Sequence, residues 1–351
     1  MPPPPSGEGT VSAAPVPAIA KSGPGAERQV LYFFVNGKEY NLAADQFQPE
    51  QTLLAWLRKE GLTGTKLGCG EGGCGACTVS VSSFDSAKNK VVHRSVNACI
   101  APVCAMDGCH VITVEGIGST RSKLHPVQQK LADFHGSQCG FCTPGFVMSM
   151  YSLLRNDAEP SKADIEHSLD GNLCRCTGYR PILDAFKDLA SDKPHRVGCC
   201  REVKDGEVPP YADAPEIPFP EKLLPQNLPL RPLKLVGSRA TWHRPSTLAG
   251  LLELKRSLPS LKIVVGNSEL EIERKFRNSA WEHLVCTSHV PEMVAISASP
   301  EGVTVGASTT LTRMKEVLEE QVLATTRPPP PPPRARRPSA PPPPVAPGPV
   351  T

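Results

Sequence analysis

Eight of the 13 cysteines fall into two sets of four, and each set has the spacing of a metal site with thiolate ligands. The first set is Cys69-x4-Cys74-x2-Cys77, followed after 21 further residues by Cys99. This spacing is typical of a plant-type loop around a [2Fe–2S] cluster, in which soft, anionic thiolates hold two irons. Zinc sites usually use two short hooks of paired cysteines instead. The first set therefore predicts a redox centre and, with it, electron transfer.

The second set is Cys139-x2-Cys142, followed after 31 residues by Cys174-x-Cys176. Two hooks of this kind suit either a [2Fe–2S] cluster or a zinc ion with four cysteine ligands. Both hooks precede predicted helices, whose positive N-terminal ends favour an anionic cluster. A zinc–thiolate group would be favoured in the same way, so the spacing alone leaves both interpretations open.

Glycines surround the first set, at positions 68, 70, 72, 73 and 75. Without a Cβ atom, a glycine lets the backbone approach closely, so that its N–H groups can point at the sulfurs. Hydrogen bonds of this kind tune the reduction potential of a cluster. Five cysteines lie outside both sets. We expect Cys104 and Cys286 to be buried apolar residues and Cys199 and Cys200 to be free thiols, whereas Cys109 has no assigned role.

Residues 29–117 have the pattern of a small α+β domain that could position the first set. Two β-rich runs over 30–42 flank Asn36-Gly37, a pair suited to a two-residue hairpin turn with positive φ at both positions. A helix is predicted over 50–60, ended by Gly61, and further strands follow the cysteine loop. This order predicts a β-grasp fold like that of [2Fe–2S] ferredoxins.

Residues 118–192 change to a helical pattern and carry the second set. Four short helices are predicted, over 125–134, 143–156, 161–169 and 180–190, and they would pack as a small bundle. For the second helix we predict Thr143 as the N-cap and Pro144 at the first helical position. For the third, Ser161 and Asp164 form a capping box.

The rest of the chain divides by composition. Residues 193–237 are polar and proline-rich, which indicates a linker, and residues 238–326 regain strand and helix patterns. The prolines concentrate in residues 1–28 and 327–351, which cannot bury an apolar core and are predicted to be disordered.

Composition excludes several classes of function. The net charge of +3 and the lack of a basic stripe argue against nucleic-acid binding. No stretch approaches the roughly 20 apolar residues that a membrane span needs. The N-terminus has neither the basic nor the apolar region of a secretory signal. We therefore expect a cytoplasmic protein, in which cysteines more often bind metal than form disulfides.

Taken together, these motifs resemble the N-terminal part of the molybdenum hydroxylase family, which contains xanthine dehydrogenase and aldehyde oxidase. The runs VITVEGIGST and VVGNSEL favour the xanthine dehydrogenases. The resemblance implies that both sets hold [2Fe–2S] clusters. It also implies a β-grasp domain, a four-helix domain and the start of a flavin-binding (PCMH-type) lobe. The matching stretches are LGCGEGGCGACTV, VNACIAPVC, HVITVEGIGST, HGSQCGFCTPGFVMSMYSLLRN and GNLCRCTGYRPIL.

In that family a molybdopterin centre hydroxylates a purine such as xanthine, and electrons pass through both clusters to FAD and on to NAD. The resemblance implies that the second set lies nearer molybdenum, with Gln138 facing the pterin, and that the first set lies nearer the flavin. The implied FAD pyrophosphate loop is Ile263, Val264, Val265, Gly266, Asn267, Ser268, Glu269 and Leu270. Gly266 would let the backbone approach phosphate.

Two departures limit what the resemblance implies. Glu271 stands where the family usually has glycine, which adds negative charge near the implied phosphate site. The family pattern also ends near residue 325. We therefore expect a partial FAD site with weak or no FAD binding, and no hydroxylation by this chain alone, with no catalytic residue assigned. The proline-rich tail fits translated non-coding sequence or a mispredicted gene end better than a functional segment.

Three other functions remain open. The chain could be an electron-transfer subunit that separate flavin and molybdenum subunits complete, or a homodimer as the family implies. It could be a non-enzymatic interaction protein whose proline-rich tail binds SH3 or WW domains. It could also be a zinc-stabilised structural protein, which would be colourless.

Overall fold

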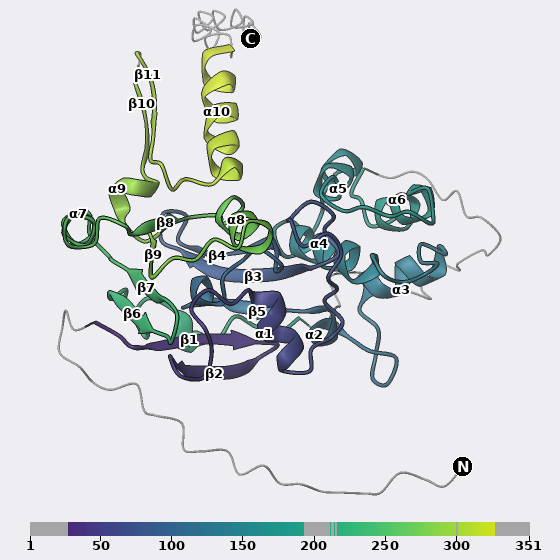
Figure 1. The fold of residues 1–351 in the computed structure, drawn as a ribbon. Coiled ribbons are helices and arrows are strands. Elements are labelled where there is room, and N and C mark those ends of the chain that lie inside the picture. The colour runs from purple at the N-terminus through teal and green to yellow at the C-terminus, as the bar shows by residue number, and fades with distance from the viewer. Residues whose placement is uncertain (1–26, 193–210, 212–213, 215, 300, 327–351) are drawn as a thin grey trace, which may run out of the picture.

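The computed structural model describes residues 27–192, 211, 214, 216–299 and 301–326 (Figure 1). The predicted disordered segments therefore fall outside the described residues, except for residues 27 and 28, and so do Cys199 and Cys200. Three parts follow one another along the described chain. They are a mixed sheet with short helices, a group of four helices, and a lobe that combines a second sheet with helices.

The first part is a five-stranded sheet of order β2-β1-β5-β3-β4, in which β1 and β5 are parallel and the other pairs are antiparallel. The β1–β2 turn confirms the predicted hairpin, because Asn36 has φ 49° and Gly37 has φ 81°. The strands are β1 Val30–Val35, β2 Lys38–Ala43, β3 Thr78–Asp85, β4 Lys90–Asn97 and β5 His110–Ile112, with α1 Leu53–Lys59, η1 Val103–Met106 and α2 Val114–Ile117 between or after them.

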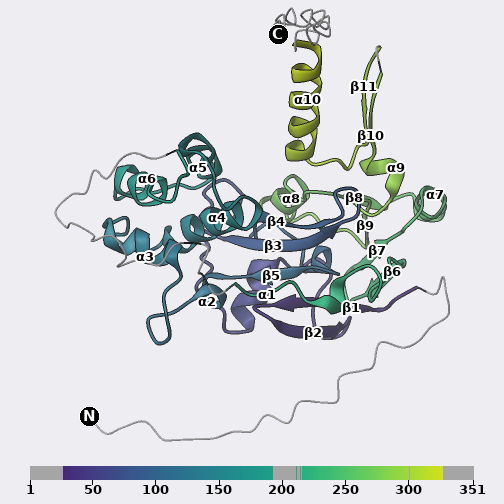
Figure 2. The same cartoon turned by 180° about the vertical axis from the view of Figure 1, so that it is seen from behind.

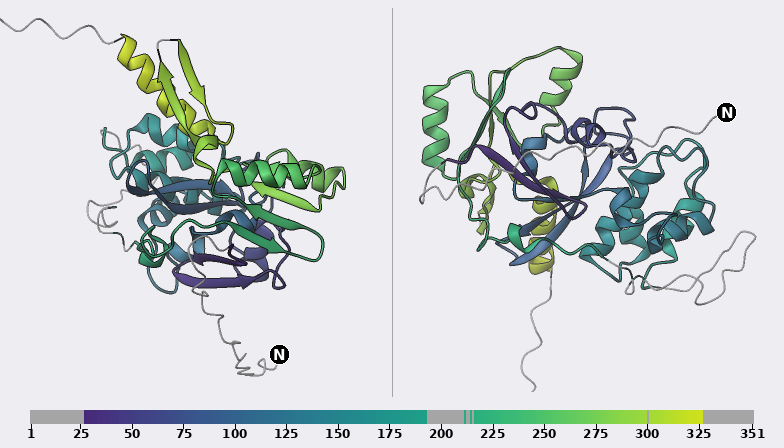
Figure 3. Two further views of the ribbon diagram at one scale, coloured as in Figure 1. Left: turned by 90° about the vertical axis from the view of Figure 1, so that its left-hand side faces the viewer. Right: turned by 90° about the horizontal axis from the view of Figure 1, so that it is seen from below.

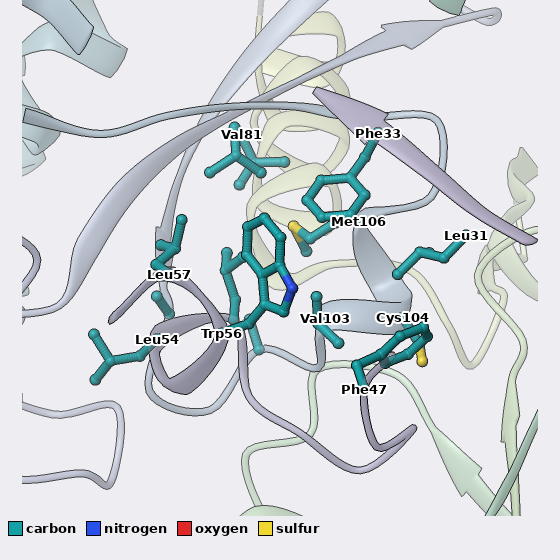
Figure 4. Close-up of a cluster of buried hydrophobic side chains, with 14 of the residues drawn as sticks. Leu31, Phe33, Phe47, Leu54, Trp56, Leu57, Val81, Val103, Cys104 and Met106 are labelled. Atoms are coloured by element: carbon teal, nitrogen blue, oxygen red, sulfur yellow. The ribbon is translucent and has the colours of Figure 1, made fainter. Parts of the chain in front are cut away.

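The core of this part forms around Trp56 of α1 (Figure 4). Its ring meets Phe33 edge-on at a centroid distance of 5.0 Å. Cys77 and Cys99 belong to the same buried cluster, whereas Cys69 is exposed. The first set of cysteines is thus anchored to the core at one end and reaches solvent at the other.

The second part confirms the four predicted helices: α3 Pro126–Asp133, α4 Thr143–Asn156, α5 Lys162–Ser168 and α6 Arg180–Lys187. Helix α4 is buried along most of its length and packs against β3 and β4, so the bundle lies beside the sheet (Figure 1). The capping box of Ser161 and Asp164 is confirmed. The predicted N-cap of α4 is wrong: Cys142 is the N-cap and Thr143 is the first helical residue.

The third part contains a four-stranded sheet of order β6-β7-β9-β8. A hairpin and the last helix project away from it (Figures 1 and 2). The elements are η3 Glu221–Leu223, β6 Leu233–Val236, β7 Thr241–Arg244, α7 Leu248–Ser257, β8 Lys262–Val264, α8 Leu270–Phe276, β9 His283–Cys286, α9 Pro291–Val294, β10 Ile296–Ser299, β11 Gly302–Val305 and α10 Leu311–Thr326.

The predicted linker over 193–237 differs from the structure at its C-terminal end. Residues 233–236 form β6, which pairs with β7 and buries Leu233 and Leu235. The nearby prolines at 229 and 232 hide this short alternating strand in the sequence. The third part therefore begins at least five residues earlier than its composition suggests.

The third part lies against the first (Figure 3). Charged residues and apolar side chains join the two parts. Asp107 is 5 % exposed and forms ion pairs with Arg28 and with Arg244, whose Nη1 lies 2.6 Å from Asp107 Oδ2. Arg28, in the segment predicted to be disordered, also pairs its backbone with β6 at Leu233. Trp242 and Leu235 continue the apolar core of the first part. These contacts hold the third part against the sheet.

Candidate iron–sulfur sites and flavin loop

The first set of cysteines converges at the loop between α1 and β3. The backbone N–H of Cys69 donates to Cys74 Sγ at 3.2 Å, and the N–H groups of Glu71 and Cys74 donate to Cys69 Sγ at 3.3 and 3.4 Å. Burial opposes ionisation of Cys69, but these backbone donors outweigh it and lower the pKa of its thiol. The loop therefore favours the thiolate form of Cys69.

The other two members of this set form a second pair at the core side of the loop. The Cys77 thiol donates a hydrogen bond to Cys99, which raises the pKa of Cys77 and lowers that of Cys99 to about 6. The Gly72 N–H and the charge of Lys275 also favour the Cys99 thiolate. Asn97, whose Nδ2 donates to Gly72 O at 2.7 Å, holds the loop next to this pair.

Glycine is required at specific points of the loop. A Cβ atom on Gly68 would lie 2.5 Å from Cys74 Sγ, which is closer than Cβ atoms approach other atoms. Gly72 has φ 78°, in the left-handed region that glycine adopts without strain, and a Cβ there would lie 2.7 Å from Ile100 Cδ1. These contacts agree with the close backbone approach that the sequence predicts.

The second set converges at the start of α4 and the loop before α6. Hydrogen bonds join Cys139 to Cys176 and Cys142 to Cys174. Burial opposes ionisation of Cys174, but hydrogen bonds from Thr177, Cys176 and Cys142 together outweigh it and lower the pKa of that thiol. Thr177 Oγ1 lies 3.1 Å from Cys174 Sγ, and its backbone N–H donates to the same sulfur at 3.4 Å.

In each set the four thiols form two pairs. Among the described residues, no three His, Cys, Asp or Glu side chains are grouped so as to hold one metal ion. The thiols instead pair as Cys69 with Cys74, Cys77 with Cys99, and likewise in the second set. A [2Fe–2S] cluster with four cysteine ligands needs two thiolates on each of two irons. The donor sets therefore fit the cluster, while the ligand assignment itself stays a prediction.

The two sites meet through the backbone. The Leu173 N–H, next to Cys174, donates to the Cys74 carbonyl at 3.0 Å. Asn172 Nδ2 donates to Gly75 O at 3.1 Å, and a Cβ on Gly145 of α4 would lie only 2.1 Å from the same oxygen. The loop of the first site is thus packed directly on the residues that carry the second.

One side of the second site faces solvent. Gln138, which the family resemblance places beside the pterin, is exposed, and so are Cys139 and Cys176. Phe141 and Leu173 are 48 % and 56 % exposed. An apolar rim around thiolates is suited to contact with another protein surface or a large cofactor.

The predicted FAD loop, Ile263–Leu270, connects β8 to α8. Ile263, Val265 and Gly266 are exposed, and a Cβ on Gly266 would meet nothing nearer than 3.9 Å. Asn267, with φ 57°, donates from Nδ2 to Ile100 O at 2.7 Å, next to Cys99. The structure therefore places this loop beside the first cysteine set, while FAD contact by its residues stays a prediction.

Glu271 does not present a free negative charge to this loop. Its side chain is 2 % exposed, and its carboxylate forms ion pairs with Arg274 and with Lys275 at 3.3 Å. Its Oε2 accepts from Arg274 Nε at 3.0 Å and lies 3.5 Å from Asn267 Nδ2. The residue that replaces the family's usual glycine is thus neutralised by its own helix.

Three residues near the sites were missed from the sequence. Thr177 follows the second hook directly, so a hydroxyl at that spacing could have suggested a hydrogen bond to sulfur. Asn172 and Lys275 gave no local signal. Lys275 Nζ donates to Gly70 O at 2.8 Å and to Cys99 O at 2.7 Å, across more than 170 residues of chain.

Comparison with known families agrees with this arrangement. Residues 33–104 match the 2Fe-2S iron-sulfur cluster binding domain, and residues 113–187 match the [2Fe-2S] binding domain. Residues 237–328 match the FAD binding domain in molybdopterin dehydrogenase. Two [2Fe–2S]-binding domains and an FAD-binding domain place the chain in the molybdenum hydroxylase class. This confirms the predicted fold class and cofactor classes.

Similar proteins narrow the class further. Xanthine dehydrogenase/oxidase of Rattus norvegicus is 48 % identical over 313 residues, covering 83 % of this chain and 23 % of the rat protein. Xanthine dehydrogenase of Drosophila pseudoobscura pseudoobscura is 47 % identical over 315 residues, with the same coverage of 83 % and 23 %. The chain belongs to the xanthine dehydrogenase family, as its resemblance predicts, and spans about a quarter of the length of these relatives.

The solved structure of quinoline 2-oxidoreductase from Pseudomonas putida 86 aligns with 46 % of this chain and 93 % of its own, with 34 % identity and a TM-score of 0.39. Within the described part of this chain, no helix has the length and apolar character of a membrane span.

Proposed function

We propose that this chain conducts electrons through two [2Fe–2S] clusters in a xanthine dehydrogenase-like oxidoreductase. The proposed ligands are Cys69, Cys74, Cys77 and Cys99 for the first cluster and Cys139, Cys142, Cys174 and Cys176 for the second. When bound, each cluster accepts and donates one electron at a time. The observation that carries the proposal is the backbone contact between Leu173 and Cys74, which joins two paired thiolate sets.

The surroundings of the two sets support a direction for this transfer. The first set adjoins the predicted flavin loop through Ile100 and Asn267. The second set opens to solvent beside Gln138. Electrons would enter at the exposed second site, from a molybdopterin beside Gln138, and leave from the first site towards FAD.

The protein around the sulfurs prepares both sites for anionic clusters. Backbone N–H groups point at Cys69 and Cys74, and the backbone N–H of Thr177 donates to Cys174. Donors held by the fold stabilise negative charge without reorganising when an electron arrives. These residues would therefore keep the cost of changing the cluster charge low.

We propose that purine hydroxylation and NAD reduction need further polypeptide that carries the molybdenum site and the rest of the flavin site, in a cytoplasmic assembly that is a homodimer. The 351-residue chain alone would bind FAD weakly or not at all and would not hydroxylate purines. Titration with FAD, followed by flavin fluorescence, tests the first expectation; binding in the micromolar range would contradict it.

The main proposal is tested by reconstituting the purified chain with iron and sulfide without oxygen. With two irons in each cluster, we expect four irons per chain, brown colour and two distinct paramagnetic signals after dithionite reduction. Cys142→Ser should remove one signal, whereas the matched control Cys109→Ser, outside both sets, should keep both. A colourless chain that holds zinc, or iron that stays at two per chain, would contradict the proposal.

A further inference from the structure

The third part of the structure, which matches an FAD-binding domain, is called the flavin lobe from here on. The side chain of Lys275 reaches from this lobe to the first cysteine set. Lys275 lies on α8, directly after the predicted FAD loop. Its Nζ donates to the carbonyl of Cys99 at 2.7 Å and to that of Gly70 at 2.8 Å. One carbonyl belongs to a proposed cluster ligand, and the other lies in the loop that wraps the site. A single ammonium group therefore links the two segments that enclose the first set.

The position of Lys275 is fixed from its own helix as well. Glu271 Oε1 lies 3.3 Å from Lys275 Nζ, and the same carboxylate is bound by Arg274. Two cations share one carboxylate, so this group of three keeps one net positive charge. The Lys275 side chain is 24 % exposed, which leaves its charge only partly screened by solvent.

Other charged side chains around this loop are placed differently. Lys66, shortly before the loop, donates from Nζ to Thr63 O at 2.7 Å. Glu71, within the loop, is exposed. Asn267, another contact from the flavin lobe, bonds Ile100 O without carrying charge. Lys275 differs from these residues, because its positive charge contacts the backbone of Cys99, a proposed cluster ligand.

We infer that Lys275 is a positioning residue that raises the reduction potential of the first cluster and fixes the flavin lobe against it. The inference rests on the proposed function. One-electron reduction adds one negative charge to the cluster, and a nearby ammonium stabilises that charge. The Glu271 carboxylate holds the ammonium in place, so the residue at the family's usual glycine position supports this contact. Electrons would consequently favour the cluster that adjoins the flavin loop.

The test is a redox titration of the reconstituted full chain, followed by the paramagnetic signals of the two clusters. Lys275→Gln removes the charge but keeps a hydrogen-bond donor, so its fold should be retained; Lys275→Arg keeps the charge. We expect Lys275→Gln to lower the equilibrium constant for reduction of the first cluster about tenfold, which is about 59 mV for one electron. The second cluster should not shift, and Lys275→Arg should retain the parent potential.

The matched control is Arg277→Gln, which removes an exposed positive charge at the end of the same helix. It should leave both potentials unchanged. An unchanged first potential in Lys275→Gln, or an equal fall in Arg277→Gln, would overturn the inference. Failure of the proposed function has a separate result, because the unsubstituted chain would then lack the first signal altogether. The Cys142→Ser variant assigns the signals, since it removes only the second cluster.

Discussion

The amide of Leu173 donates a hydrogen bond of 3.0 Å to the carbonyl of Cys74, so a residue beside one proposed ligand is bonded to a ligand of the other set. The contact uses backbone atoms from two domains, and its geometry does not depend on a flexible side chain. Packing at Gly75 and Asn172 reinforces it. The separation between the two sites is therefore set by the domain interface, which can be tested directly.

Gly145→Ala should disrupt this interface. The added Cβ would lie 2.1 Å from Gly75 O, and backbone atoms on both sides leave little room to adjust. We expect a loss of about 1–3 kcal/mol in the free energy of unfolding, as is typical of overpacking, measured by urea denaturation. Gly171→Ala is the matched control, because its Cβ would meet nothing within 4 Å. Equal stability of the two variants would contradict the tight contact.

Thr177→Val should lower the potential of the second cluster alone. An iron-bound thiolate has no proton, so the hydroxyl 3.1 Å from Cys174 Sγ must donate, and this donation favours the reduced state. A neutral hydrogen bond contributes about 0.5–1.5 kcal/mol, which predicts a fall of roughly 20–65 mV in redox titration. Thr143→Val, whose hydroxyl bonds Ser137 instead, is the control. An equal shift in both variants would argue against the sulfur contact.

Asp107→Asn should loosen the flavin lobe from the first domain. Asp107 is buried between Arg28 and Arg244, and the substitution leaves two buried guanidinium groups without their counter-charge. Breaking a buried ion pair costs about 3–5 kcal/mol, which chemical denaturation would detect. Glu253→Gln, in an exposed pair with Arg256, should cost less than about 1 kcal/mol. A small effect in both variants would show that the buried group does not join the two parts.

The lowered pKa of Glu216 leads us to predict that the free energy of unfolding depends on pH. Burial opposes its ionisation, but hydrogen bonds from His125, Tyr151 and Arg155 outweigh it and lower its pKa from 4.5 to about 2. A depressed pKa means that the ionised group stabilises the fold fully above pH 4.5 and that this contribution is lost as pH falls towards 2. Tyr211 also faces this carboxylate.

The measurement compares unfolding of the parent chain with that of Glu216→Gln across this range. The parent should be more stable at pH 6, and the difference should shrink between pH 4.5 and 2. Glu159→Gln, an exposed substitution after α4, should show no such trend. A constant difference at every pH would mean that Glu216 acts through packing and not through its charge.

Local sequence patterns predicted the elements that local chemistry determines. Asn36-Gly37 predicted its hairpin because few residues adopt positive φ at both turn positions. The cysteine spacing predicted which thiols would converge, because a short loop limits where its ligands can lie. Thr143 was wrongly predicted as the N-cap of α4, since the chain turns one residue earlier and leaves Cys142 in that position.

Contacts between distant segments could not be predicted in this way. Nothing near Lys275 in the sequence indicates that it reaches Gly70, 205 residues away. The sequence indicated only that Glu271 places a negative charge near the FAD loop. The structure shows that this side chain is buried and pairs with Arg274 and Lys275 of its own helix. Likewise, β6 is recognisable as a strand once it pairs with β7, because four residues carry too little pattern alone.

The pairing of Arg28 with Leu233 has a consequence for how the chain is made. Arg28 bonds Pro232 O and Lys234 N through its backbone and Asp107 through its side chain, so it lies between two parts of the molecule. During synthesis the first domain emerges long before residue 233 does, and domains generally fold in that order. Until then Asp107 has neither Arg244 nor a docked Arg28 beside it. The newly made first domain therefore carries Asp107 without its partner Arg244, and we expect it to reach its final stability only after the third part has folded against it.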